Sequence, residues 1–195
     1  MKSVFFDIDT QIDFLFPAGA LYVPGAEKIV PSIVRLNRHA SSHAITVVST
    51  TCAHTENDPE FREWPAHCVV DTVGQRKPAA TLLDRRLVIP NKTVEFALAD
   101  AQQVILEKQA LDLFTNPNLS RLLETLTADQ YVVYGVVTEY CVRCAAMGLL
   151  ATGKPVSLVT DAVETLNKED SSRMLREFTS QGGLLATADE ICQRG

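Results

Sequence analysis

The chain of 195 residues has no apolar run near the ~18 residues that a membrane-spanning helix needs. Positive charge is also in short supply, because 18 lysines and arginines stand against 24 aspartates and glutamates, for a net charge of -6. An acidic chain is a poor match for nucleic acid or an anionic membrane. These shortages favour a small molecule as the main partner, with neither nucleic acid nor a membrane involved.

A disulfide framework is missing as well, since the five cysteines are odd in number and irregularly spaced. The first residues run straight into Val4-Phe5-Phe6-Asp7 without the charged and apolar regions of a signal peptide. We therefore expect a reducing cytoplasm. With 46% hydrophobic residues and no repeat or low-complexity tract, residues 1–195 are expected to form one domain.

Short apolar runs alternate with amphipathic stretches along the chain. This rhythm predicts an α/β fold, a three-layer αβα sandwich around a mostly parallel sheet. The expected strands are Ser3–Ile8, Ala44–Thr50, Val104–Glu107, Tyr131–Val137, Val156–Val159 and Leu184–Ala186. The expected helices are Ala26–Ser41, Pro117–Thr127, Tyr140–Thr152 and Lys168–Gln181, with a short terminal helix after them.

The stretch from about 51 to 87 breaks this rhythm with three prolines, two histidines, two cysteines and the only tryptophan. Long irregular connections in compact domains are usually functional or disordered. Because this composition does not suit disorder, we interpret the stretch as a loop that forms part of a site.

Cys141 follows an apolar run and a Gly/Thr turn, at the start of a helical pattern. A helix N-terminus carries about half a positive charge, which favours thiolate over thiol and predicts a nucleophile. Asp9 and Lys108 follow two other predicted strands. Because the carboxyl ends of parallel strands share one edge, all three residues can converge. The carboxylate would then exchange a proton with the thiol, and the ammonium would hold both groups in place.

A second group of candidate ligands lies in the irregular loop. Cys52 and His54 alternate along an extended backbone and so point the same way. His67 lies in Trp64-Pro65-Ala66-His67-Cys68. Imidazole and thiolate can hold Zn²⁺, and imidazole also suits Fe or Mn, although this is not a zinc-finger spacing. Hydrogen-bonded or solvent-facing histidines are the alternative.

Two other motifs are typical of different protein classes. Phe5–Thr10 resembles the opening motif of haloacid dehalogenase-type (HAD) phosphatases, but Thr160–Glu164 offers only an incomplete version of their later acidic pair. Cys141 and Cys144 form a C-x-x-C pair far from the position typical of a thioredoxin-like domain. We interpret Cys144 as a small apolar residue of the helix.

Together the motifs resemble the isochorismatase-like superfamily of hydrolases, and within it the nicotinamidase branch. Asp9-Thr10-Gln11-Ile12-Asp13-Phe14 resembles the family's Asp-x-Gln-x-Asp-Phe, and Val137–Arg143 resembles its nucleophile motif, where Thr-Asp-x-Cys-Val is typical. Lys108 matches the third member of an Asp-Lys-Cys triad. The resemblance covers essentially the whole chain, and it implies that Asp9, Lys108 and Cys141 are catalytic.

The resemblance also implies further site residues. Trp64–Cys68 resembles the nicotinamidase Trp-Pro-x-His-Cys segment, in which the histidine binds metal and the tryptophan lines the pyridine pocket. His54 matches a second ligand, whereas Cys52 occupies the position of an aspartate, so the divalent metal, Zn or Fe, could differ in preference or be lost. Glu60 is a further ligand candidate.

The family implies a cis peptide between Val137 and Thr138, with the N–H groups of Thr138 and Cys141 forming an oxyanion hole. Phe14 and Trp64 are expected to form the walls of an aromatic pocket. Members of the family are often oligomeric, so a homo-oligomer is compatible with the resemblance.

The resulting hypothesis is a cysteine amidohydrolase that acts on a small carboxamide through a thioester, with nicotinamide as the expected substrate. One alternative is a metal-independent amidase for carbamoyl or ureido compounds from the same superfamily. From other classes, a HAD-type phosphatase and a catalytically silent binding module remain open.

Overall fold

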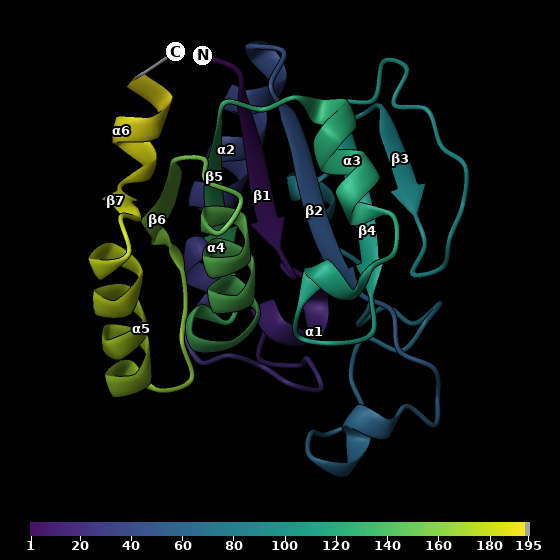
Figure 1. Cartoon of the computed structure of the whole chain (residues 1–195). Helices are drawn as coiled ribbons and strands as arrows, with labels where there is room; N and C mark the ends of the chain where they lie inside the picture. Colours follow the sequence, from purple (N-terminus) through teal and green to yellow (C-terminus); the bar gives the residue numbers. More distant parts are fainter. Residues whose placement is uncertain (194–195) are drawn as a thin grey trace.

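A computed structural model describes residues 1–193 of the chain, and its centre is a sheet of seven strands (Figure 1). The strand order is β3-β4-β2-β1-β5-β6-β7, and every pair of neighbours is parallel. The strands are β1 (Ser3–Ile8), β2 (Thr46–Cys52), β3 (Arg86–Ile89), β4 (Gln103–Lys108), β5 (Gln130–Gly135), β6 (Val156–Val163) and β7 (Leu184–Ala186).

Helices cover both faces of the sheet, with α3 and α4 in front and α2 behind in Figure 1. The α-helices are α1 (Ile12–Leu15), α2 (Val30–Ser42), α3 (Leu119–Leu126), α4 (Arg143–Leu150), α5 (Lys168–Ser180) and α6 (Ala188–Gln193). Shorter 3₁₀ turns are η1 (Ala26–Ile29), η2 (Pro59–Arg62), η3 (Ala79–Thr81) and η4 (Leu113–Thr115), and η5 (Thr138–Val142) is a π-helical turn. The predicted three-layer α/β fold is confirmed.

Two hydrophobic cores, one on each face, hold the layers together. Leu119, Leu122 and Leu126 recur at helical spacing along α3 and are buried with α4 and α5 against the front of the sheet. Ile33 and Leu36 of α2 are buried with α6 against the back. Burial of each such side chain stabilises the fold by about 1.5–3 kcal/mol. The apolar stripes therefore fix which way each helix faces.

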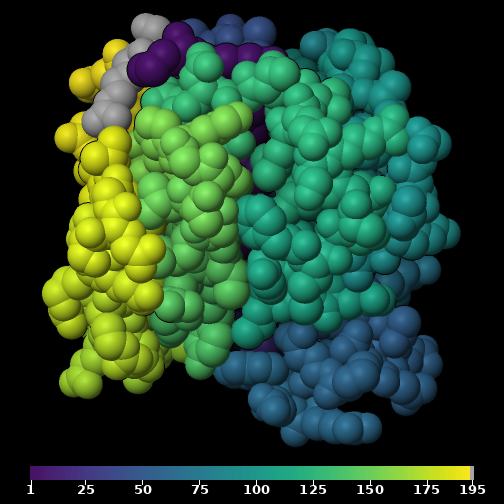
Figure 2. All heavy atoms as spheres, viewed as in Figure 1, coloured from purple at the N-terminus to yellow at the C-terminus, as the bar shows by residue number. Residues whose placement is uncertain are grey.

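The chain adds strands first on one side of β1 and then on the other. β2, β3 and β4 lie on one side, with β3 at the edge, and β5, β6 and β7 lie on the other. In open α/β sheets, ligands bind outside the carboxyl ends of the strands near such a switch point. The segment after β2, blue in Figure 2, projects at this edge.

Most elements match the sequence predictions to within a few residues. The loop expected at about 51–87 contains η2 and η3, while β2 extends to Cys52 and the unpredicted edge strand β3 begins at Arg86. Two of the four residues of β3 are exposed, and its apolar run is only three residues long. The helix α1 was also not predicted. A single domain over residues 1–195 stays a prediction, and its last two residues lie outside the described part. Within residues 1–193, we find no helix long and apolar enough to cross a membrane.

Candidate active site

The side chains of Asp9, Lys108 and Cys141 meet at the carboxyl edge of the sheet. Lys108 Nζ lies 2.8 Å from Asp9 Oδ2 and 3.5 Å from Cys141 Sγ. All three residues are buried, with at most 6% of their surface exposed. They come from the ends of β1, β4 and β5, which the parallel topology brings to one edge. The expected convergence is therefore present.

Asp9 is held by the backbone and by the neighbouring strand. Its φ of 49° lies in the left-handed region, which turns the chain sharply after β1. Thr50 of β2 donates its hydroxyl to Asp9 Oδ1 (2.6 Å) and accepts from the Asp9 N–H (3.1 Å). With the other carboxylate oxygen on Lys108, the Asp9 side chain is fixed at both oxygens.

Burial is the largest influence on the pKa of the Cys141 thiol. It raises the pKa of Cys141 well above the usual value, opposed by the Lys108 ammonium and reinforced by the Asp9 carboxylate. Burial alone would lower the pKa of Lys108, but Asp9 and the thiols of Cys141 and Cys52 outweigh it and raise that pKa. Burial therefore opposes the thiolate that a helix N-terminus and the Lys108 ammonium favour, and a base is needed to take the thiol proton.

The backbone before the nucleophile differs from the expectation by one residue. The cis peptide joins Val136 to Val137, not Val137 to Thr138. The Thr138 N–H donates to the Glu164 carbonyl at 2.9 Å, and its hydroxyl donates to the same oxygen at 2.8 Å. An N–H bonded to a carbonyl is not free to hold an oxyanion, so the assignment of Thr138 does not fit the structure. In residues 1–193 we find no acceptor for the Val137 N–H.

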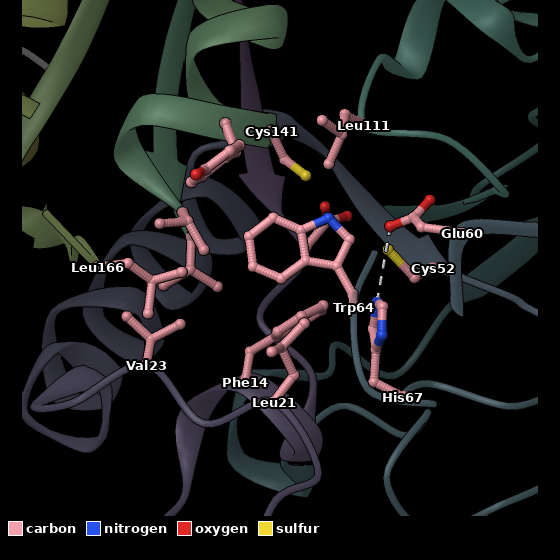
Figure 3. A pocket seen from close by; sticks show the side chains of 14 residues that line it. Phe14, Leu21, Val23, Cys52, Glu60, Trp64, His67, Leu111, Cys141 and Leu166 are labelled. Carbon is pink, nitrogen blue, oxygen red and sulfur yellow. Dashed lines mark ion pairs between the residues drawn. The ribbon is translucent and has the colours of Figure 1, made fainter. Parts of the chain in front are cut away.

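A cavity opens beside the Cys141 thiol (Figure 3). Phe14 and Trp64, expected as its walls, both line it. Tyr140 also lines it and packs edge-on against Trp64, with ring centroids 5.4 Å apart. Tyr140 was not assigned from the sequence, although its place directly before the nucleophile is a usable signal. The remaining apolar lining comes from Leu21, Val23, Val136, Val137, Leu111 and Leu166.

Cys52 and His67 line this cavity, and His54 lies next to them. Their ligand atoms are all within 4.8 Å of one another, and all three residues are buried. Glu60 reaches the same place, with Oε1 3.8 Å from His67 Nε2. The structure therefore brings the predicted ligand candidates together, with Glu60 beside them.

Each of the two histidines has a partner at Nδ1 that orients its ring. His54 Nδ1 lies 3.0 Å from the Asp58 carboxylate, and the fully buried Nε2 of His54 has no hydrogen-bond partner among the described residues. His67 Nδ1 bonds the Pro65 carbonyl (2.8 Å), and burial lowers the pKa of His67, so its imidazole is neutral. Carboxylate and carbonyl partners of this kind orient metal-binding histidines. The donor set of sulfur, nitrogen and carboxylate oxygen fits Zn²⁺.

Side chains from the turn after β1 hold the irregular loop in place. Gln11 accepts from the Cys52 N–H (2.7 Å) and donates to the Cys52 carbonyl (2.9 Å). Asp13 accepts from the Cys68 N–H at 2.7 Å, next to His67. Gly74 passes so close that an added Cβ would lie 2.2 Å from the Asp13 carboxylate. The roles of Gln11, Asp13 and Asp58 were not predicted, although an aspartate four residues after His54 is a usable signal.

Comparison with known proteins places this geometry in a family. The profile of the Isochorismatase domain matches residues 3–190. The nicotinamidase of Escherichia coli K12 is 25% identical, over 92% of this chain and 92% of the relative. The maleamate amidohydrolase of Pseudomonas putida KT2440 is 26% identical, over 99% of this chain and 86% of that protein.

A solved structure shows a similar fold. The pyrazinamidase of Pyrococcus horikoshii, determined in complex with zinc, superposes with a TM-score of 0.80 at 30% identity, covering 96% of this chain and 99% of that one. The resemblance to the nicotinamidase branch is thereby confirmed. With its profile spanning nearly every residue, the chain belongs to the isochorismatase family.

Proposed function

We propose that the protein is a cysteine amidohydrolase that converts a small neutral aromatic carboxamide, nicotinamide in the first place, to the acid and ammonia. The observation that carries this proposal is the meeting of a thiol, a carboxylate and an ammonium at one wall of an apolar cavity. Each group has a role in amide hydrolysis, and their burial keeps bulk water from weakening the charges.

The reaction divides into two steps at Cys141. Asp9 takes the thiol proton while Sγ attacks the carboxamide carbon, and the same proton then passes to the departing nitrogen, which leaves as ammonia. In the second step Asp9 takes a proton from water, whose oxygen attacks the thioester and releases the acid and the thiol. Lys108 keeps Asp9 charged and oriented through both steps. Asp9 therefore serves as base and acid in turn.

The oxyanion of each tetrahedral intermediate needs donors beside Cys141. The Val137 N–H replaces that of Thr138 in this role, because Val137 lines the cavity and Thr138 is bonded to Glu164. The N–H of Cys141 stays as the second donor. Backbone donors of this kind contribute about 3–4 kcal/mol each to transition-state stabilisation.

The second group of residues suits a divalent metal. Cys52, His54, His67 and Glu60 would hold it, and when bound it supplies a Lewis acid that attracts a ring nitrogen of the substrate. His54 and His67 supply imidazole nitrogens for this purpose, and Cys52 makes the donor set softer than one with aspartate. Zn²⁺ therefore fits this set better than Mg²⁺ or Mn²⁺.

The cavity favours a neutral substrate over an anionic one. Its lining contains Asp9 and Glu60 but no lysine or arginine within the described residues. The relative named for maleamate acts on an anion, and a carboxylate of that kind needs a cationic partner on burial. Aromatic side chains from Phe14, Trp64 and Tyr140 instead suit a flat ring.

An ammonia-release assay tests the proposal. Nicotinamide, pyrazinamide, maleamate and a ureido compound are compared on the metal-loaded protein and on the Cys141→Ala variant. We expect turnover of the two aromatic amides, a loss of more than about 10³-fold in Cys141→Ala, and an unchanged circular dichroism spectrum. A fully active variant would refute the nucleophile, and turnover of the ureido compound alone by metal-free protein would favour the carbamoyl amidase alternative.

A further inference from the structure

The segment that follows β6 is fastened to the turn that carries the nucleophile. Glu139 of η5 accepts hydrogen bonds from the Leu166 N–H (3.0 Å) and the Asn167 N–H (2.8 Å) on one oxygen. Its other oxygen accepts from the Thr165 hydroxyl at 2.6 Å. Thr138 adds two bonds to the Glu164 carbonyl. We call residues 164–167 the strap.

The strap carries one wall of the substrate cavity. Leu166 lines the cavity and lies beside Val23, on the side away from Cys52 and His67 (Figure 3). Its side chain is 40% exposed at the mouth, so packing in the core does not hold it there. Its position depends on the strap backbone.

The strap is fixed at its far end as well. The side chain of Asn167 caps α5 by accepting from the N–H groups of Glu169 (2.9 Å) and Asp170 (3.2 Å). Hydrogen bonds to an ionised carboxylate are about twice as strong as neutral ones. Glu139 therefore supplies the main anchor between the wall and Cys141, only two residues away along the chain.

We propose that Leu166 limits the size of the acyl group that reaches the thiol, and that Glu139 is the positioning residue that keeps Leu166 in the cavity. The inference rests on the proposed function for its physiological meaning. The length of the side chain at 139 matters, because an aspartate is one carbon, about 1.5 Å, shorter and would draw its carboxylate back from the strap.

Leu166→Ala tests the wall, with Leu184→Ala as a matched control on β7, where the leucine is 51% exposed and outside the cavity. The ratio of kcat/KM for a ring-methylated or ring-phenylated nicotinamide to that for nicotinamide is measured in each variant. We expect it to rise about tenfold in Leu166→Ala and to stay unchanged in the control. An unchanged ratio in Leu166→Ala would overturn the proposal.

Alkylation of Cys141 also measures how large a group can reach the thiol, and it does not depend on amide turnover. The labelling rates with iodoacetamide and with the bulkier N-phenyliodoacetamide are followed by mass spectrometry of the Cys141 peptide. The bulky-to-small ratio should rise in Leu166→Ala and not in Leu184→Ala. If no amide is hydrolysed while this ratio still rises, the proposed function fails and the role of Leu166 stands; if amides are hydrolysed and neither ratio moves, only the inference fails.

The anchor is tested with Glu139→Ala and the conservative Glu139→Gln. In Glu139→Ala the acceptor is lost, so the kcat/KM ratio and the alkylation ratio should both rise, as in Leu166→Ala. KM should rise more than kcat falls, since Cys141 is untouched. The glutamine keeps an acceptor oxygen for the two backbone N–H groups and should restore the ratios. A merely structural role would lower the activity on all substrates equally in Glu139→Ala, and that result would overturn the assignment.

Discussion

The catalytic residues and the candidate metal ligands at the sheet edge are held in place in different ways. Asp9 directly follows β1 and Lys108 ends β4, so the hydrogen-bonded ladder of the sheet sets their spacing, and Cys141 lies in η5, the turn after β5. His54 and His67 instead lie in irregular backbone that side-chain hydrogen bonds from Gln11 and Asp13 hold to the core. The first group is rigid because of topology, and the second because of a few individual contacts.

Cys52 connects the two groups. It is the last residue of β2, in register with Lys108 on β4, and its sulfur lies 3.4 Å from Lys108 Nζ. The ammonium has three N–H donors, but Asp9, the Ala110 carbonyl and both thiols surround it. The two sulfurs therefore share one donor. We therefore expect substitutions in the catalytic residues to stop the chemistry, and substitutions in the candidate metal ligands to weaken substrate binding.

The largest effect is expected from Lys108→Met. Removing the ammonium leaves the buried Asp9 carboxylate without its cation, which costs roughly 3–5 kcal/mol of unfolding free energy. We also expect kcat to fall by more than about 10³-fold. Urea unfolding and the ammonia assay measure both quantities, with the exposed Lys168→Met as the control. A kcat within tenfold of the wild type would show that the lysine is not needed.

His54→Ala tests whether the candidate metal ligands act on substrate binding without affecting the catalytic residues. The metal content measured by elemental analysis should fall and KM for nicotinamide should rise about 10–100-fold. The rate of Cys141 alkylation should stay the same, because no triad contact is removed. Chelation of the wild type should reproduce these changes, and the exposed His43→Ala serves as the control. Loss of Cys141 reactivity in His54→Ala would contradict the separation of the groups.

The smallest effect concerns stability at alkaline pH. Because burial raises the pKa of the Cys141 thiol, the folded state keeps this proton above pH 9 while the unfolded state releases it. The unfolding free energy should therefore fall with rising pH, by up to about 1.4 kcal/mol per pH unit for this group. The raised pKa of Lys108 means that its stabilising contribution persists to its unfolded value of 10.5 and disappears only above that.

Urea unfolding between pH 8 and pH 10 (roughly the range in which free thiols ionise) tests the sign. The decline should be shallower in Cys141→Ala, which lacks the thiol. An equal decline in both proteins would mean that Cys141 is already ionised in the folded state.

The sequence located six of the seven strands to within a few residues. The buried strand Ser3–Ile8 and the edge strand Leu184–Ala186, whose two leucines are exposed, were predicted with their observed bounds. The half-exposed strand β3 was missed because its apolar run is only three residues long and lies between two arginines and a proline. The ligand candidates Cys52, His54 and His67 could be predicted because thiol and imidazole are the groups that bind such metals. Their orienting partner Asp58 was not predicted.

Some features of the site could not be predicted from a local motif. The charge at a helix N-terminus favours a thiolate at Cys141, but burial and the Asp9 carboxylate raise the pKa of this thiol. Thr138 was expected to supply an oxyanion donor, but the Glu164 carbonyl, 26 residues further along the chain, occupies its N–H. Neither burial nor a partner so distant can be read from a local motif.

By itself, the order of residues determined which chemical groups the chain carries and that Asp9, Lys108 and Cys141 lie at or beyond the carboxyl ends of strands of one parallel sheet. Local periodicity and side-chain chemistry suffice for this, because they act over a few residues. Only the tertiary structure decided which donors remain free, which histidine nitrogens face the shared site, and which wall Leu166 provides. Those properties arise from contacts between distant segments, and burial at those contacts sets the charge of each group.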